Sequence, residues 1–175
     1  EIYKMKKREV VQLGWSQRNH SFFNNLPLDP SVFNKYFMFG SRNCYKTQSL
    51  TEDLKHHNST LSCKVLPMLS DDICNQILSQ SIVFLNLYDA IANNGILDCI
   101  ERNTPVIVNR SPSSEEYLGE EYPLFYENSD SVEKILKLFS DEKILEAHNY
   151  LCNLDKSKFN INIFMKGIED IIKNV

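Results

Sequence analysis

"SIVFLNLYDAIANNGILDCIERNTPVIVN" (residues 81–109) contains two short apolar runs separated by an amphipathic segment. The runs "SIVFLNL" and "TPVIVN" are apolar at successive positions, which is typical of parallel strands covered on both faces. Between them, "NNGILDCIERN" places Ile96, Leu97 and Ile100 on one face of a helix. The stretch therefore predicts two buried parallel strands joined by a crossover helix.

Similar patterns recur along the chain and predict six strands bounded by turn residues. We expect these strands at Glu9–Leu13, Tyr36–Phe39, Cys63–Met68, Ile82–Leu87, Pro105–Asn109 and Leu124–Tyr126. Helices are expected at residues 49–57, 70–80, 93–103 and 113–119, and two or three more follow within residues 127–175. Ser70, followed by two aspartates, has the pattern of a helix N-cap.

This alternation predicts an α/β fold, a Rossmann-like doubly wound parallel sheet of about six strands with C-terminal helices. We expect one domain over residues 1–175, with terminal helices at 127–175. If the strand order is 3-2-1-4-5-6, the switch point lies between the first and fourth strands. The loops that follow them, "GWSQRNHS" and "YDAIANNG", are then where a ligand should bind.

Composition limits the kind of protein this can be. The chain has 175 residues, a net charge of -4 and a pI of about 5.6, which disfavours nucleic acid as a partner. No apolar stretch approaches the ~20 residues that span a bilayer. The five cysteines form no C-x-x-C pair, so we expect reduced, mostly buried thiols in a cytoplasmic protein and no cysteine-bound metal. Since the sequence lacks an initiator Met, we expect it to be part of a longer protein.

The helix expected near Asn93 has the features of a phosphate site. Its first backbone N–H groups lack intrahelical partners and carry the positive end of the helix dipole. Gly95 allows close approach of a diphosphate, and Asn93 or Asn94 could cap the helix or donate an amide to the ligand. Asp98, about one turn further, could accept hydrogen bonds from ribose hydroxyls. The alternative is that Asn93 is an ordinary N-cap and Asp98 a solvated surface residue.

The order of these motifs resembles the C-terminal, nucleotide-sugar-binding domain of GT-B-fold glycosyltransferases, most clearly from Val65 to Tyr126. The matching segments include "DCI" at residues 98–100, "NTPVI" at 103–107 and "EYLG" at 116–119. Agreement is weaker at "VVQLGW" and "YFMFGS", the expected first and second strands. The resemblance implies half of a GT-B fold, with the N-terminal acceptor domain not present in this chain.

The resemblance also implies roles for individual residues. Asp98 would hold the nucleotide ribose, while Asn93, Asn94 and Gly95 would face the sugar and the diphosphate. Arg18, after the first strand, would neutralise the diphosphate through its bidentate donor fork, unless it is a plain surface arginine.

Met68, with its neighbours Pro67 and Leu69, would lie near the base, unless these residues only pack the loop. Trp15 either stacks on a ligand or seals the edge of the domain. The catalytic candidates are Asp89 and His20. Retaining members often carry two glutamates eight positions apart, whereas here Ala90 and Asp98 occupy those positions.

The function implied is the donor-binding domain of a glycosyltransferase, which binds a nucleoside-diphosphate sugar and transfers the sugar to a glycan, protein or lipid acceptor. No metal or other cofactor is expected, and activity would need the second domain. Two alternatives keep the same fold: a non-catalytic nucleotide-binding or interaction module, and a sugar-nucleotide epimerase-like domain.

Overall fold

A computed structural model describes residues 7–39, 50–52, 54–56, 60–88 and 93–173 of the chain. Within them, six parallel strands form one sheet in the order β3-β2-β1-β4-β5-β6. The strands are β1 (Arg8–Leu13), β2 (Phe33–Met38), β3 (Lys64–Val65), β4 (Ser81–Leu85), β5 (Val106–Asn109) and β6 (Phe125–Tyr126). The order confirms the predicted doubly wound sheet and places its switch point between β1 and β4.

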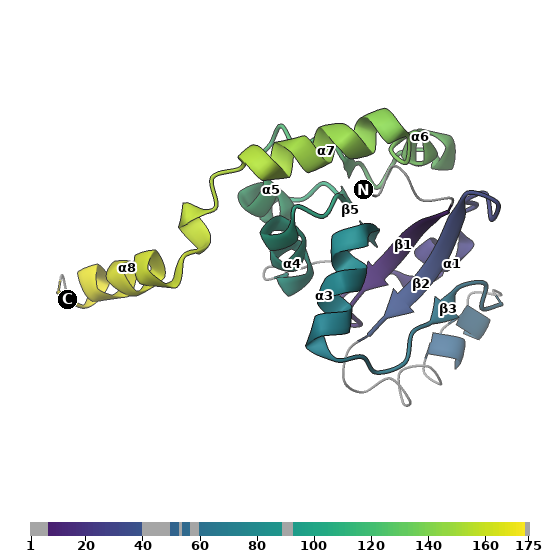
Figure 1. Ribbon diagram of the computed structural model, residues 1–175, viewed down its shortest axis with the longest axis horizontal. Helices are drawn as coiled ribbons and strands as arrows, with labels where there is room; N and C mark the ends of the chain where they lie inside the picture. The colour runs from purple at the N-terminus through teal and green to yellow at the C-terminus, as the bar shows by residue number, and fades with distance from the viewer. Residues whose placement is uncertain (1–6, 40–49, 53, 57–59, 89–92, 174–175) are drawn as a thin grey trace.

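Helices cover both faces of the central strands, and every residue of β4 and β5 is buried. Figure 1 shows α3 (Asp71–Gln80) on one face and α1 (His20–Asn25) on the other. Phe23 of α1 stacks on Phe84 of β4 at 5.6 Å and meets the edge of Phe37 at 5.4 Å between ring centroids. Burial on both sides explains why these strands lack an alternating pattern of apolar and polar residues.

The remaining helices follow the predicted ranges. They are α4 (Asn94–Arg102), α5 (Pro112–Leu118), α6 (Val132–Lys137), α7 (Asp141–Asn153), η2 (Ser157–Phe159) and α8 (Ile161–Lys173). Residues 50–52 and 54–56 are also helical. In Figure 1, α6 and α7 lie along one edge of the body, whereas α8 projects away from the sheet. Within the described residues, no helix combines the length and apolar character needed to cross a membrane.

The clearest differences from the predictions are in β2, β3, β4 and α1. The second strand begins at Phe33 instead of Tyr36 and ends at Met38. The third strand is shorter, because pairing with β2 ends where Leu66 donates to the Phe37 carbonyl, and the next residue, Pro67, has no N–H. The fourth strand ends at Leu85 instead of Leu87. Helix α1 was not predicted, since its six residues span too few turns to show a periodic pattern. Ser70 occupies the N-cap position of α3, but its side chain makes no capping hydrogen bond.

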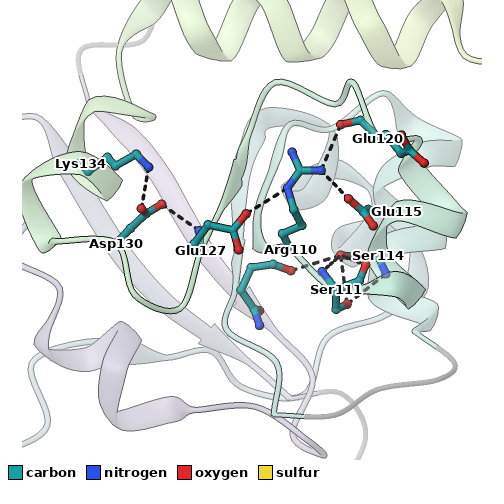
Figure 2. A network of polar contacts seen from close by, with 9 residues as sticks. Arg110, Ser111, Ser114, Glu115, Glu120, Glu127, Asp130 and Lys134 are labelled. Carbon is teal, nitrogen blue, oxygen red and sulfur yellow. Dashed lines mark hydrogen bonds and ion pairs between the residues drawn. The ribbon is translucent and has the colours of Figure 1, made fainter.

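A polar network joins the carboxyl ends of β5 and β6 to α5 and α6 (Figure 2). Arg110, just after β5, forms ion pairs with Glu115 of α5 and with Glu127 after β6. Its guanidinium also lies over the Phe125 ring, 4.6 Å from the centroid. Asp130 accepts from the Glu127 backbone N–H at 2.8 Å. The charge of Arg110 is therefore balanced by local carboxylates that fix this edge of the domain.

Of the cysteines that the structure describes, Cys63 and Cys99 are buried, Cys74 is half-buried and Cys152 is exposed. None of these four forms a disulfide. Cys44 lies outside the described residues. The thiols described are thus free, and two of them serve as small core residues.

Candidate functional site

The loops that leave β1 and β4 are joined by backbone hydrogen bonds at the switch point. The Asn19 N–H donates to the Asn86 carbonyl at 2.8 Å, and the Tyr88 N–H donates to the Gln17 carbonyl at 3.2 Å. An isolated antiparallel bridge links Arg18 to Leu87 between these two bonds. The two loops where the sequence predicted a ligand therefore form one surface.

Buried side chains stabilise this surface through hydrogen bonds to the backbone at the end of β4. The Asn109 amide at the end of β5 accepts from the Leu87 N–H at 2.7 Å and donates to the Leu87 carbonyl at 2.9 Å. The Asn86 amide donates to the Tyr126 hydroxyl at 2.8 Å, which itself donates to the Leu85 carbonyl. The backbone that leaves β4 is thus paired on both sides before it reaches the helix α4.

Arg18 lies across the start of α4 and is partly buried. Its Nε donates to the Leu13 carbonyl at 2.9 Å, and one terminal nitrogen donates to Asn93 Oδ1 at 3.0 Å. The other terminal nitrogen donates to the Ser16 carbonyl. Burial lowers the pKa of the Arg18 guanidinium. These three bonds hold the cation in one orientation. A guanidinium has five N–H groups, so two of them have no acceptor among the residues that the structure describes.

Asn93 caps α4, as the sequence suggested. It is 2% exposed, and its Oδ1 accepts from the Ile96 N–H at 3.3 Å as well as from Arg18. Its Nδ2 is buried and has no hydrogen-bond partner among the described residues. Buried amide groups without partners are rare in proteins, so this nitrogen marks a position where an acceptor is missing.

Gly95 completes the same cluster. A Cβ at this position would lie 3.1 Å from Asn93 Oδ1 and 3.5 Å from the terminal nitrogen of Arg18. Glycine therefore keeps the start of α4 close to the guanidinium, although its own backbone conformation is an ordinary helical one. The structure thus brings together Arg18, Asn93 and Gly95, three of the residues predicted to bind the diphosphate.

Asn94 and Asp98 lie elsewhere on α4. They line a groove of about 600 Å³ that also includes Lys156 and Phe159, near η2. The Asp98 side chain is 43% exposed and pairs with Arg102 one turn later, at 3.1 Å. Asp98 therefore does not share a cavity with Arg18, and a ligand that contacts both must pass around the N-terminal end of α4.

The remaining predicted residues occupy varied positions. Met68 lies in the loop after β3 and is 66% exposed. Asp89, one of the catalytic candidates, lies outside the described residues, as does Ala90.

His20, the other catalytic candidate, is 5% exposed, with Nε2 3.0 Å from the Trp15 carbonyl and Nδ1 bonded to Gln12. Trp15 stacks on the His20 ring at 4.6 Å. Both ring nitrogens of His20 thus have protein partners in this conformation.

A cavity of about 610 Å³ opens beside Arg18 at the switch point. It is lined by Trp15, Ser16, Gln17, Arg18, His20, Glu52, His56 and Tyr88. Glu52, His56 and Tyr88 were not among the predicted site residues. The sequence signal for Glu52 and His56 was their spacing of four, which places both on one side of the helix predicted at residues 49–57. Tyr88 belongs to the loop "YDAIANNG", where a ligand was expected.

No grouping of three His, Cys, Asp or Glu side chains suited to a metal ion occurs in the described parts of the chain. The polar groups gathered at the start of α4 are instead the Arg18 guanidinium, the Asn93 amide and backbone N–H groups. Such donors suit an anionic ligand.

Several solved structures have a similar fold. HepE from Anabaena in complex with UDP-glucose is 13% identical, with a TM-score of 0.70 over 96% of this chain and 49% of HepE. A glycosyltransferase from Rickettsia africae is 11% identical, with a TM-score of 0.63 over 98% of this chain and 49% of its own. WaaG, a glycosyltransferase involved in lipopolysaccharide biosynthesis, is 15% identical, with a TM-score of 0.57 over 87% and 44%. This chain spans about half the length of each.

These likenesses establish the fold as that of one half of a GT-B glycosyltransferase, in agreement with the predicted C-terminal domain. No protein-family model and no curated protein sequence matches the chain. The N-terminal domain of Candida albicans trehalose-6-phosphate phosphatase is also similar, at 12% identity and a TM-score of 0.54. Because proteins named for different activities share this fold, function has to be argued from the site.

Proposed function

We propose that this chain is the donor-binding domain of a glycosyltransferase and binds a nucleoside-diphosphate sugar. The observation that carries the proposal is the buried Nδ2 of Asn93, which has no partner among the described residues and lies beside Arg18 and the N-terminus of α4. A phosphate oxygen would accept from this amide, from the guanidinium and from the free N–H groups of the helix. The fold of UDP-glucose-bound HepE supports the same class of ligand.

The same groups would assist the transfer reaction. When the bond between sugar and diphosphate breaks, negative charge develops on the diphosphate. Arg18 is held beside the N-terminus of α4 by hydrogen bonds, so these groups would stabilise that charge without rearranging. This positive field would serve in place of a bound metal ion. The acceptor, whether glycan, protein or lipid, would bind a second domain of the parent protein.

A second candidate is a non-catalytic nucleotide-binding module. It is favoured by Ala90, which stands eight positions before Asp98 where retaining enzymes of this fold often carry a glutamate. The module would bind the nucleotide through the same cluster and would not transfer the sugar. Both candidates share the diphosphate site, so that site is the one to test first.

Substitution of Asn93 by aspartate separates binding from folding. Asp caps helices as well as Asn does, and its carboxylate would pair with Arg18, so the variant should keep the stability of the parent. The same carboxylate would repel a diphosphate, and we expect the affinity for UDP or GDP to fall about tenfold or more. Isothermal titration calorimetry with UDP, GDP, UDP-glucose and GDP-mannose measures this effect.

The matched control is Asn128→Asp, which adds the same charge at an exposed position. Equal nucleotide affinity in the parent and in Asn93→Asp would exclude this cluster as the diphosphate site. If none of the four ligands binds the parent chain, the donor-binding function itself is excluded. Product analysis on the full-length parent protein then distinguishes a transferase from a module.

A further inference from the structure

The cavity at the switch point contains polar groups that the diphosphate would not use. Glu52 and His56, four positions apart in the helical residues 50–52 and 54–56, line this cavity together with residues of the loop after β1. Neither side chain has a hydrogen bond or an ion pair with any described residue, and both are exposed. They lie in one cavity with Arg18, which is bonded to the start of α4.

Two aromatic side chains line the same cavity. Tyr88 is 64% exposed, an unusual degree for a tyrosine that follows a central buried strand. Its backbone N–H donates to the Gln17 carbonyl, which joins Tyr88 to the loop after β1. Trp15 is half-buried against His20 and Phe39 and also lines the cavity.

We infer that this cavity receives the sugar of the bound nucleotide and that Glu52 and His56 select a neutral pyranose. The inference rests on the proposed function, because it uses the diphosphate bound beside Arg18 as its starting point. A pyranose attached to that diphosphate extends from Arg18 into the cavity that Arg18 lines. There, aromatic rings cover its apolar C–H face, and the carboxylate and imidazole bond its hydroxyls.

The charges of the side chains that line the cavity determine which sugars bind. The Arg18 guanidinium already bonds two backbone carbonyls and Asn93, and its remaining donors face the diphosphate. Among the described residues that line the cavity, Glu52 carries the only carboxylate. It accepts hydrogen bonds from hydroxyls and repels a second carboxylate, so a uronic acid would bind more weakly than a hexose.

The test compares each nucleotide with its sugar derivative. Calorimetry on the 175-residue chain uses UDP with UDP-glucose, and GDP with GDP-mannose, and proceeds with the pair whose nucleotide binds. We expect Glu52→Gln and His56→Ala each to lower the affinity for the sugar nucleotide about tenfold. Affinity for the bare nucleotide should change less than about twofold, because neither residue contacts the diphosphate.

Lys55→Ala is the matched control, since Lys55 is exposed on the same helical residues and does not line the cavity. Melting temperatures of all three variants should match that of the parent, because the substituted side chains are exposed. If Glu52→Gln leaves the sugar nucleotide unaffected, or lowers both ligands equally, the inference is wrong and the diphosphate site stands. If no nucleotide binds the parent chain, both the inference and the proposed function fail.

Discussion

Asn109 should contribute far more to stability than an ordinary asparagine, because its side chain pairs with the Leu87 backbone as a neighbouring strand would. It is 3% exposed, and its amide forms hydrogen bonds of 2.7 and 2.9 Å with the N–H and the carbonyl of Leu87. Leu87 itself is 4% exposed. In Asn109→Ala, both backbone groups would lose their partner in a place that water barely reaches.

The expected cost follows from these two groups. Each buried polar group left unpaired costs about 1–3 kcal/mol, so Asn109→Ala should lose about 3 kcal/mol of folding free energy. For a chain of this size, that loss corresponds to a fall of about 6–12 °C in melting temperature. Urea denaturation followed by far-UV circular dichroism measures the change in unfolding free energy.

The single tryptophan offers a second readout at the same site, because Trp15 lies in the loop that pairs with residues 86–88. A larger shift by fluorescence than by circular dichroism would show that the loops at the switch point open before the sheet unfolds. Asn128→Ala removes an exposed amide and serves as the control. A loss in Asn109→Ala no larger than about 0.5 kcal/mol, as surface substitutions give, would refute the reasoning.

The folding stability of the Asn109→Asp variant should depend on pH. One carboxylate oxygen can still accept from the Leu87 N–H, but the other faces the Leu87 carbonyl, and only the protonated acid can donate to it. The folded state therefore raises the pKa of the new carboxyl above its unfolded value of about 3.9. The variant should be less stable than the parent at pH 7 and should recover as pH falls through the folded pKa. A stability difference that does not change between pH 7 and pH 4 would contradict this assignment.

Three further substitutions test local features. Gly119 has a φ of +84°, and a Cβ there would lie 2.6 Å from the Tyr150 hydroxyl oxygen, so Gly119→Ala should cost about 2–3 kcal/mol in urea unfolding. Gln17 has a φ of +58°, and Gln17→Gly should raise stability by about 0.5 kcal/mol, seen as a higher urea midpoint. Cys152 is exposed, whereas burial raises the pKa of the Cys99 thiol. Cys152→Ser should therefore remove a thiol that reacts rapidly with a disulfide reagent in the folded protein, whereas Cys99 should react only after unfolding.

The sheet was predictable because its central strands carry a strong signal. Val83, Phe84 and Leu85 are apolar at successive positions, as are Val106, Ile107 and Val108, and such short runs are typical of strands buried on both faces. Once those strands alternate with helices, the right-handed crossover rule leaves few arrangements.

The polar contacts beneath the site were not predictable in the same way. Asn109 ends a strand in the sequence, and nothing local indicates that its amide pairs with Leu87, 22 positions earlier. Helix α1 was missed for a related reason: it is short, and it is stabilised by the contacts of Phe22 and Phe23 with the sheet.

The sequence also indicates which residues near the start of α4 lie on the same face of the helix. Asn93 is the N-cap of α4 and has an extended backbone, so helical spacing does not place it on one face with Asp98. Asn94 and Asp98, four positions apart, share a face, and the structure places these two in the same groove. Asn94 and Asp98 could therefore contact the same ligand in this groove. Asn93, the N-cap, bonds Arg18 instead.

The separation of these residues bears on the kind of ligand that fits. The structure separates three features: the groove that Asp98 lines along α4, the cluster of Arg18, Asn93 and Gly95 at the start of α4, and the cavity that Glu52 lines beside Arg18. On the proposed function, they would receive the nucleoside, the diphosphate and the sugar in that order. A ligand made of only one of these parts would leave the other two features unused, and inorganic phosphate would gain only the contacts of the cluster. An extended ligand with a central diphosphate uses all three, because it can bend around the end of the helix where free N–H groups meet its charge.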